Sequence, residues 1–199
     1  MRRKVIEFFL LKYYIVDMVL TWKKIVEIEG STNSAYTSIA KRKYKRVSHG
    51  VYVSEGESIS ELEQLFARYP RATLTMQSAF DYYELSDYVP DKYYVATSYN
   101  AHTINNPKVS QVYMNGELTK IGRVKIKTKY GHIYIFDKER MLIELFRLKC
   151  KLPHSYFMEV VSSYRALKSK DAISLRKVSE YCKYFAVGNR VLKEIQEMI

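Results

Sequence analysis

The segment from residue 21 to residue 54 constrains the fold most strongly, because it predicts two short helices followed directly by a β-hairpin. Thr21 is placed to cap the first helix, whose apolar stripe stops at Gly30. The second helix is capped by one of the next three residues, Ser31, Thr32 or Asn33. A glycine-containing turn between two short helices indicates a helix-turn-helix.

A β-hairpin is predicted immediately after the second helix. Residues 44–47 and 51–54 are typical of two short strands, joined by residues 48–50. Gly50 supplies the positive φ that a three-residue hairpin loop with a bulge requires. A helix-turn-helix that continues into a hairpin predicts a winged helix-turn-helix, and we expect this to be the first domain, residues 1–57.

The joint between the second helix and the hairpin carries a run of cations without any acid. The run lies in AKRKYKRVSHGVYV and comprises Lys41, Arg42, Lys43, Lys45 and Arg46. Most isolated charge runs are simply solvated, but the position of this one favours contact with DNA phosphates beside a groove. If about five cations each neutralise a phosphate, the log-log dependence of affinity on salt has a slope of roughly −4 to −5.

The second helix is predicted to present a polar stripe to the major groove. Ala35 and Ile39 are expected to face inward, opposite four polar side chains: Ser34, Thr37, Ser38 and Lys41. Small hydroxyls suit a groove about 12 Å wide. The residues predicted to approach bases or nearby phosphates are Ser34, Tyr36, Thr37, Ser38 and Lys41. Those predicted to contact the DNA backbone are Lys23, Lys24, Arg42, Lys43, Lys45 and Arg46, with His49 at the hairpin tip.

The overall composition also favours a polyanionic partner. The 199-residue chain has 33 basic and 21 acidic residues, a formal net charge of +12, which favours nucleic acid over a neutral small molecule. Cys150 and Cys182 show no metal-binding or disulfide spacing, which fits a cytoplasmic protein. The segment Val5–Leu20 is strongly apolar, but charged residues interrupt it, so we expect a buried helix and neither a membrane span nor a targeting segment.

Residues 58–199 predict a second domain of the α+β class with a helical C-terminal tail. Ser60 and Glu63 form a capping box for its first helix, which Pro70 ends. The dipeptide Asn115-Gly116 predicts a hairpin between the two strands that flank it. The expected elements after residue 70 are strands at 72–75, 93–97, 109–114, 122–128 and 133–136, a helix at 77–85, and helices from residue 137 onward.

One strand of this domain carries a second basic face. Four cations alternate with smaller or apolar residues and are expected on one face of the strand: Arg123, Lys125, Lys127 and Lys129. Two interpretations remain open. The face contacts DNA or an acidic partner, or its lysines protect a sheet edge against aggregation.

The sequence contains no recognisable catalytic motif. Its histidines are scattered without metal-binding spacing, and neither a GxSxG nucleophile nor a phosphate-binding glycine loop is present. Pro90-Asp91 begins like a PD-(D/E)xK nuclease motif, but no Asp-x-Lys or Glu-x-Lys occurs anywhere in the chain. We therefore expect no catalytic residues, metal or cofactor. A metal-dependent nuclease or modifying enzyme, using Asp81 and Glu84, is kept as a lesser alternative.

The order of the predicted parts and three short motifs carry a family resemblance. The motifs are Arg46–Tyr52 in the hairpin, Ser78-Ala79 after a strand, and Asp137–Arg140 at a helix start. Together with RYPRATLTMQSAFDYYELSDYVPDKYYVAT and DKERMLIELFR, they make nearly the whole chain similar to the AbiEi-type antitoxins of bacterial type IV toxin-antitoxin and abortive-infection systems.

This resemblance implies a role for each domain. The N-terminal winged helix-turn-helix would repress its own operon at inverted repeats. The larger C-terminal domain would counter a nucleotidyltransferase-like toxin without a stable complex. We therefore expect a cytoplasmic autorepressor and antitoxin whose partners are double-stranded DNA and that toxin. An RNA-binding module that protects the toxin's RNA substrate is the main alternative, because the same charge would serve it.

Overall fold

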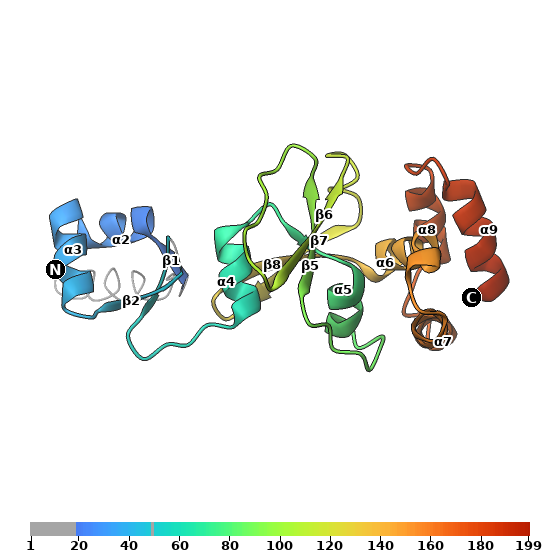
Figure 1. Cartoon of the computed structure of the whole chain (residues 1–199), viewed down its shortest axis with the longest axis horizontal. Coiled ribbons are helices and arrows are strands. Elements are labelled where there is room, and N and C mark those ends of the chain that lie inside the picture. Colours follow the sequence, from blue (N-terminus) through green and yellow to red (C-terminus); the bar gives the residue numbers. More distant parts are fainter. Residues whose placement is uncertain (1–18, 49) are drawn as a thin grey trace, which may run out of the picture. The chain divides into compact units, whose positions relative to one another are not determined.

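The computed structural model describes residues 19–48 and 50–199 and has the predicted mixed α+β architecture, with helices at its C-terminal end (Figure 1). Its described residues divide into two compact units. The first comprises residues 19–48, 50–70 and 127–133, and the second comprises residues 71–126 and 134–199. The first unit therefore extends beyond the predicted boundary at residue 57.

The first unit begins with two helices and a small sheet. Its elements are β1 (Val19–Thr21), α2 (Trp22–Glu29), α3 (Thr32–Ala40), β2 (Tyr44–Ser48), β3 (Val51–Ser54) and α4 (Glu61–Arg68). The predicted caps are confirmed. Thr21 Oγ1 accepts from the N–H of Lys24 at the start of α2, and Ser31 Oγ accepts from the N–H of Ser34 at the start of α3. Gly30, with φ of 79°, ends α2 in the left-handed conformation.

The hairpin is also confirmed, and it belongs to a three-stranded sheet. The strand order is β1-β3-β2, and both pairs are antiparallel. Gly50 has φ of 74°, and the register shifts between Arg46 and Ser48, as a bulged hairpin requires. The predicted helix over residues 5–20 is wrong at its end, because Val19–Thr21 is strand β1. Residues 5–18 of that prediction lie outside the described residues.

A compact apolar core joins α2 and α3 to the three-stranded sheet of this unit. The fully or nearly buried residues of this core are Leu20, Ile25, Ala35 and Tyr44. Partly buried side chains pack around them: Trp22, Val26, Ile28, Ile39 and Tyr52. Leu20 contributes from β1, so the pairing of β1 with β3 places an apolar side chain in the core.

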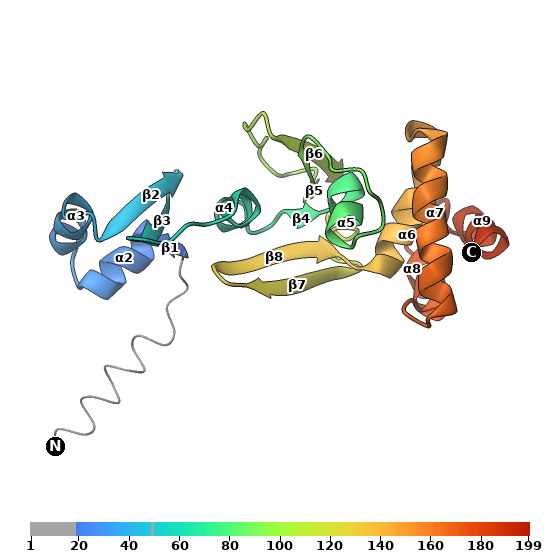
Figure 2. The same ribbon diagram turned by 90° about the horizontal axis from the view of Figure 1, so that it is seen from below.

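The second unit is built on a mixed sheet with the order β6-β5-β4-β8-β7. Its elements are β4 (Thr73–Leu74), α5 (Met76–Tyr82), β5 (Tyr93–Ser98), β6 (Val109–Met114), β7 (Arg123–Thr128), β8 (Gly131–Phe136), α6 (Lys138–Arg147), a 3₁₀ turn (Lys149–Lys151), α7 (His154–Ser169), α8 (Leu175–Cys182) and α9 (Gly188–Met198). The tip of the β7–β8 hairpin belongs to the first unit. Figure 2 shows β7 and β8 side by side as this hairpin.

The predicted hairpin at Asn115-Gly116 is wrong. β6 pairs in parallel with β5, whereas β7 lies at the opposite edge of the sheet. The asparagine makes a local turn instead, since its side-chain Oδ1 accepts from the N–H of Glu117. Parallel pairing of β6 with β5 is a long-range arrangement that the dipeptide does not encode.

The helix predicted over residues 77–85 is also shorter than expected. α5 ends at Tyr82, and Glu84 follows with φ of 56°. The N–H of Glu84 donates to Asp81 O, and the N–H of Leu85 donates to Phe80 O, so these residues close the helix end. Asp81 and Glu84 therefore do not share a helix face.

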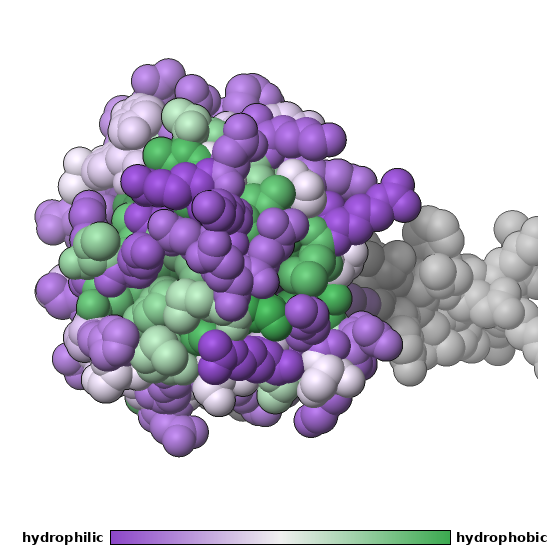
Figure 3. Space-filling view, turned by 90° about the vertical axis from the view of Figure 1, so that its right-hand side faces the viewer, coloured by the Kyte–Doolittle hydropathy of each residue, from purple (hydrophilic) through white to green (hydrophobic). Residues whose placement is uncertain are grey.

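The C-terminal helices are confirmed as predicted. Asp137 caps α6, and the apolar faces of α6, α7 and α9 supply buried residues to the core of the second unit, including Met141, Val160 and Ile195. Figure 3 faces these helices and shows hydrophilic side chains over most of that surface, with apolar atoms between them. No helix within residues 19–48 or 50–199 combines the length and apolar composition that crossing a membrane requires.

Candidate nucleic-acid interface

The joint between α3 and β2 is a tight turn that directs successive cations in different directions. Arg42 has φ of 59°, and its N–H donates to Ile39 O at 2.9 Å. The N–H of Lys43 donates to Ser38 O at 3.0 Å. This pair of bonds around a left-handed residue is a Schellman motif, in which glycine is the usual central residue. Here an exposed arginine occupies that position.

A single carboxylate organises the inner side of this joint. Glu29 lies in the last turn of α2, and its side chain is 11% exposed. One carboxylate oxygen accepts from Lys43 Nζ at 2.6 Å and from Tyr44 Oη at 2.7 Å, and the other accepts from Ser38 Oγ at 2.8 Å. We call Glu29 and these three partners the Glu29 cluster. It connects the end of α2 to α3 and to the start of β2.

The hydrogen bonds of the cluster fix its charge states. The bonds from Lys43 and Tyr44 lower the pKa of Glu29 to about 2, so its carboxylate is ionised at neutral pH. The bond to Glu29 raises the pKa of Lys43, which keeps that lysine protonated. Burial raises the pKa of the Tyr44 phenol, which stays neutral and donates its proton.

Two residues predicted to contact DNA are therefore hydrogen-bonded to Glu29. Lys43 pairs with Glu29, and the half-buried Ser38 directs its hydroxyl to the same carboxylate. The Lys43 side chain remains 57% exposed, so its predicted contact with DNA stays a prediction. Sequence analysis missed Glu29, although a carboxylate in the last turn of a helix opposes the helix dipole and thus indicates a compensating partner.

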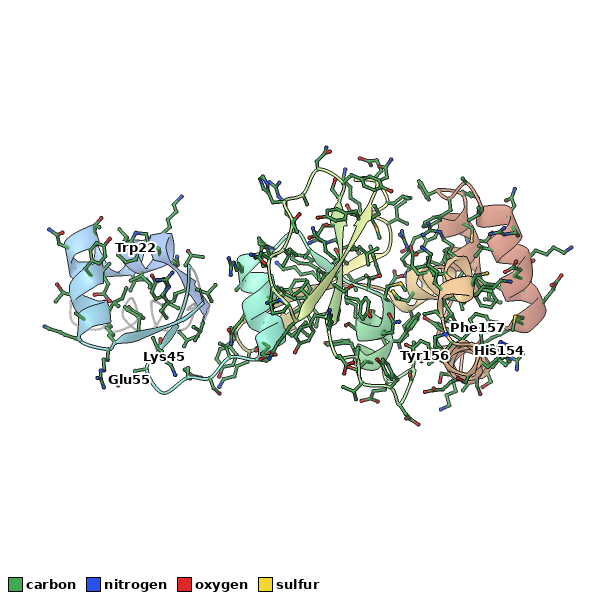
Figure 4. All side chains as sticks on the ribbon, viewed as in Figure 1. Trp22, Lys45, Glu55, His154, Tyr156 and Phe157 are labelled. Carbon is green, nitrogen blue, oxygen red and sulfur yellow. The ribbon has the colours of Figure 1, made fainter. Side chains whose placement is uncertain are left out.

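All five cations of the run are exposed: Lys41, Arg42, Lys43, Lys45 and Arg46. Lys45 and Arg46 are neighbours on β2 and therefore lie on opposite faces of the strand. Arg46 stands opposite Tyr52, on the face that packs toward the helices, and Lys45 stands opposite Val53. In Figure 4, Lys45 lies on the hairpin side of the unit together with Glu55, while Trp22 lies beside the helices.

The outward face of α3 is polar, with one large aromatic side chain. Tyr36 is 62% exposed, and its ring centroid lies 4.7 Å from that of the half-buried Trp22. Thr37 is exposed, although its hydroxyl donates to Asn33 O within the helix. Ser34 is half-buried, and its N–H donates to the capping Ser31. Ala35 is fully buried, as predicted, whereas Ile39 is partly buried against the core.

The remaining predicted DNA contacts differ in their surroundings. Lys23 is exposed on α2, whereas Lys24 is half-buried and pairs with Glu27 at 3.1 Å. His49, predicted at the hairpin tip, lies outside the described residues. Exposed cations and the polar α3 face thus occur in one small unit, with Glu27 and Glu29 as the acids that neutralise two of its lysines.

The second basic face does not present four equivalent cations. Arg123 Nε donates to Thr73 Oγ1 at 2.9 Å, and its guanidinium carbon lies 3.6 Å from the ring centroid of Tyr134. Lys129 pairs with Glu57 at 3.1 Å. Lys125 and Lys127 are exposed on β7, which lies at an edge of the sheet. This arrangement agrees with edge protection as well as with a contact surface.

The described residues 19–48 and 50–199 contain no group of three His, Cys, Asp or Glu side chains that could hold a metal ion. The sequence matches no protein-family model and no curated protein with significance. Fold and charge, together with the resemblance noted in the sequence, are therefore the basis for a functional proposal.

Proposed function

We propose that the chain is a sequence-specific DNA-binding autorepressor, with a winged helix-turn-helix in residues 19–57 as its DNA-binding part. In this proposal α3 enters the major groove and the β2–β3 hairpin is the wing. Exposed cations at the α3–β2 joint contact the phosphates beside the groove. The α3 face, with Tyr36 and Thr37, approaches the base edges.

The observation that carries this proposal is the position of the exposed cations Lys41, Arg42 and Lys45. They lie where a polar-faced helix meets a hairpin, within five positions of one another in the chain. A duplex presents phosphates on both sides of its groove, so a helix in the groove requires positive charge at its end and on the adjoining strand. A merely solvated charge run does not require this coincidence with a polar helix face.

The number of phosphate contacts gives a quantitative test. The three cations that carry the proposal are Lys41, Arg42 and Lys45, and the log-log salt slope is about −2.7 if each neutralises one phosphate. We expect fluorescence anisotropy of a duplex from the chain's own promoter region to give a slope near this value. A flat salt response would contradict phosphate binding.

Variants of the joint test its location. Replacing Lys41 and Lys45 together with Ala should weaken promoter binding about tenfold or more and reduce the magnitude of the salt slope by about 1.8. The matched control replaces two exposed cations of β7, Lys125 and Lys127, with Ala. Unchanged affinity in the Lys41/Lys45 variant would remove the joint from the interface, and a loss confined to the β7 variant would move the interface to that strand.

The antitoxin part of the proposal rests on the resemblance to AbiEi-type antitoxins. We propose that residues 58–199 counter a nucleotidyltransferase-like toxin. Co-expression with the product of a neighbouring nucleotidyltransferase-like gene tests this, with growth as the readout. Rescue by residues 58–199 alone, without the DNA-binding part, would support a separate antitoxin domain. Competition between promoter duplex and tRNA at equal salt separates DNA binding from RNA binding, because tighter tRNA binding would favour the RNA-binding alternative.

A further inference from the structure

The Glu29 cluster contains a carboxylate whose position packing alone does not explain. A carboxylate on a proposed DNA-binding surface repels phosphates, and its place at the C-terminal end of α2 is unfavourable for the helix dipole. Both effects disfavour an acid at this position. Its three short hydrogen bonds reach Ser38, Lys43 and Tyr44 and are the compensation that the structure provides.

Each of these bonds ties down a different piece of the proposed interface. Ser38 lies on the helix proposed to enter the groove, Lys43 lies in the turn after it, and Tyr44 begins the proposed wing. Arg42 lies between two tied residues, with its backbone fixed by the Schellman motif. The carboxylate therefore sets the angle between α3 and β2, and with it the spacing of the exposed cations on either side.

We infer that Glu29 is a positioning residue for the binding of duplex DNA. It holds α3 and the wing at the spacing that a groove and its flanking phosphates require, and it binds Lys43 so that this lysine does not contact a phosphate. This inference rests on the proposed DNA-binding function. It assigns two different roles to the charged residues at the α3–β2 joint. Lys41, Arg42 and Lys45 contact DNA, whereas Lys43 and Glu29 fix the relative positions of α3 and β2.

The direction in which Glu29→Gln changes the affinity for DNA separates this role from simple electrostatic repulsion. Removing an acid from a phosphate-binding surface should strengthen DNA binding, because repulsion is lost. Removing a positioning acid should weaken it. We expect Glu29→Gln to lower affinity for the promoter duplex about tenfold, while the control Glu27→Gln, in the same helix and also paired with a lysine, leaves affinity unchanged or raises it.

The salt slope provides a readout that general loss of stability would not move. In Glu29→Gln the released Lys43 is free to reach a phosphate, so the slope should steepen by about 0.9 although binding weakens. Lys43→Met should leave the slope at the wild-type value, because that lysine makes no phosphate contact. The double variant should combine weakened binding with a wild-type slope.

The measurements are anisotropy titrations of promoter and scrambled duplexes at several salt concentrations, with circular dichroism to verify that each variant is folded. Tighter binding by Glu29→Gln, or a slope that flattens by about 0.9 in Lys43→Met, overturns the inference and leaves the proposed function standing. If Glu29→Gln does not fold, the slope of Lys43→Met decides alone. Absence of salt-dependent duplex binding in the wild type overturns the proposed function and, with it, this inference.

Discussion

The Glu29 cluster and the cluster around Arg140 in the second unit use the same chemistry in opposite environments. In each, one carboxylate receives hydrogen bonds from a neighbouring cation. Arg140 and Glu144 are 0% and 3% exposed, whereas Lys43, the partner of Glu29, is 57% exposed. A cation in the sequence thus becomes part of a core or part of a surface according to what surrounds it.

The Arg140 cluster explains the path of the chain after β6. One guanidinium nitrogen donates to Leu118 O at 3.0 Å and to Ile121 O at 3.3 Å, and the other two nitrogens contact Glu144 at 2.6 and 2.9 Å. The guanidinium carbon lies 4.4 Å from the Phe185 ring centroid. Every face of this buried ion therefore has a partner, which is the condition under which a buried charge is tolerated.

Loss of Arg140 should have the largest effect on stability. Arg140→Ala removes the bonds to two backbone carbonyls and one of the two cations that contact the buried Glu144, so we expect the free energy of unfolding to fall by about 3–5 kcal/mol. Urea denaturation measures this. The control Lys125→Ala, at an exposed site on β7, should stay within about 0.5 kcal/mol of the wild type. Equal stabilities of the two variants would contradict the assigned difference between buried and exposed cations.

The Glu29 cluster should make the stability of the fold depend on pH in the acidic range. Glu29 has its pKa lowered from 4.5 to about 2, so its stabilising contribution is complete above 4.5 and is lost as pH falls through about 2. We expect about 1–2 kcal/mol to be lost in this range, after allowance for the exposure of Lys43. The measurement is the thermal midpoint between pH 6 and pH 2, compared with Glu29→Gln. A parallel decline in both proteins would show that other groups cause it.

The smallest expected effect is a gain in stability. Arg42 holds a left-handed backbone conformation that favours glycine, so Arg42→Gly should raise the free energy of unfolding by about 0.5–1 kcal/mol. The same change should weaken promoter binding, because it removes an exposed cation of the proposed interface. Thermal unfolding and anisotropy measure the two effects. Full DNA affinity in this variant would mean that strain at Arg42 serves no contact with DNA.

Much of the proposed interface was predictable because its signals are local. Thr21, Ser31, Gly30 and Gly50 define caps and turns through bonds and backbone angles within a few residues. The pairing of β1 with β3 was not predictable in this way. Val19–Thr21 is too short to show a strand period, and it becomes a strand because β3 offers it backbone partners thirty or more positions away.

The sequence by itself determined where short helices, turns and the bulged hairpin occur, and it determined that a run of five cations follows α3. Tertiary structure alone decided the direction of each charge. Glu29 pairs with Lys43, Tyr134 and Thr73 hold Arg123, and Arg140 is enclosed between the segment after β6 and the C-terminal helices. The physical reason is range: caps and turns depend on neighbours one helical turn away, whereas a charge is satisfied by whichever partner the folded chain brings within about 3 Å.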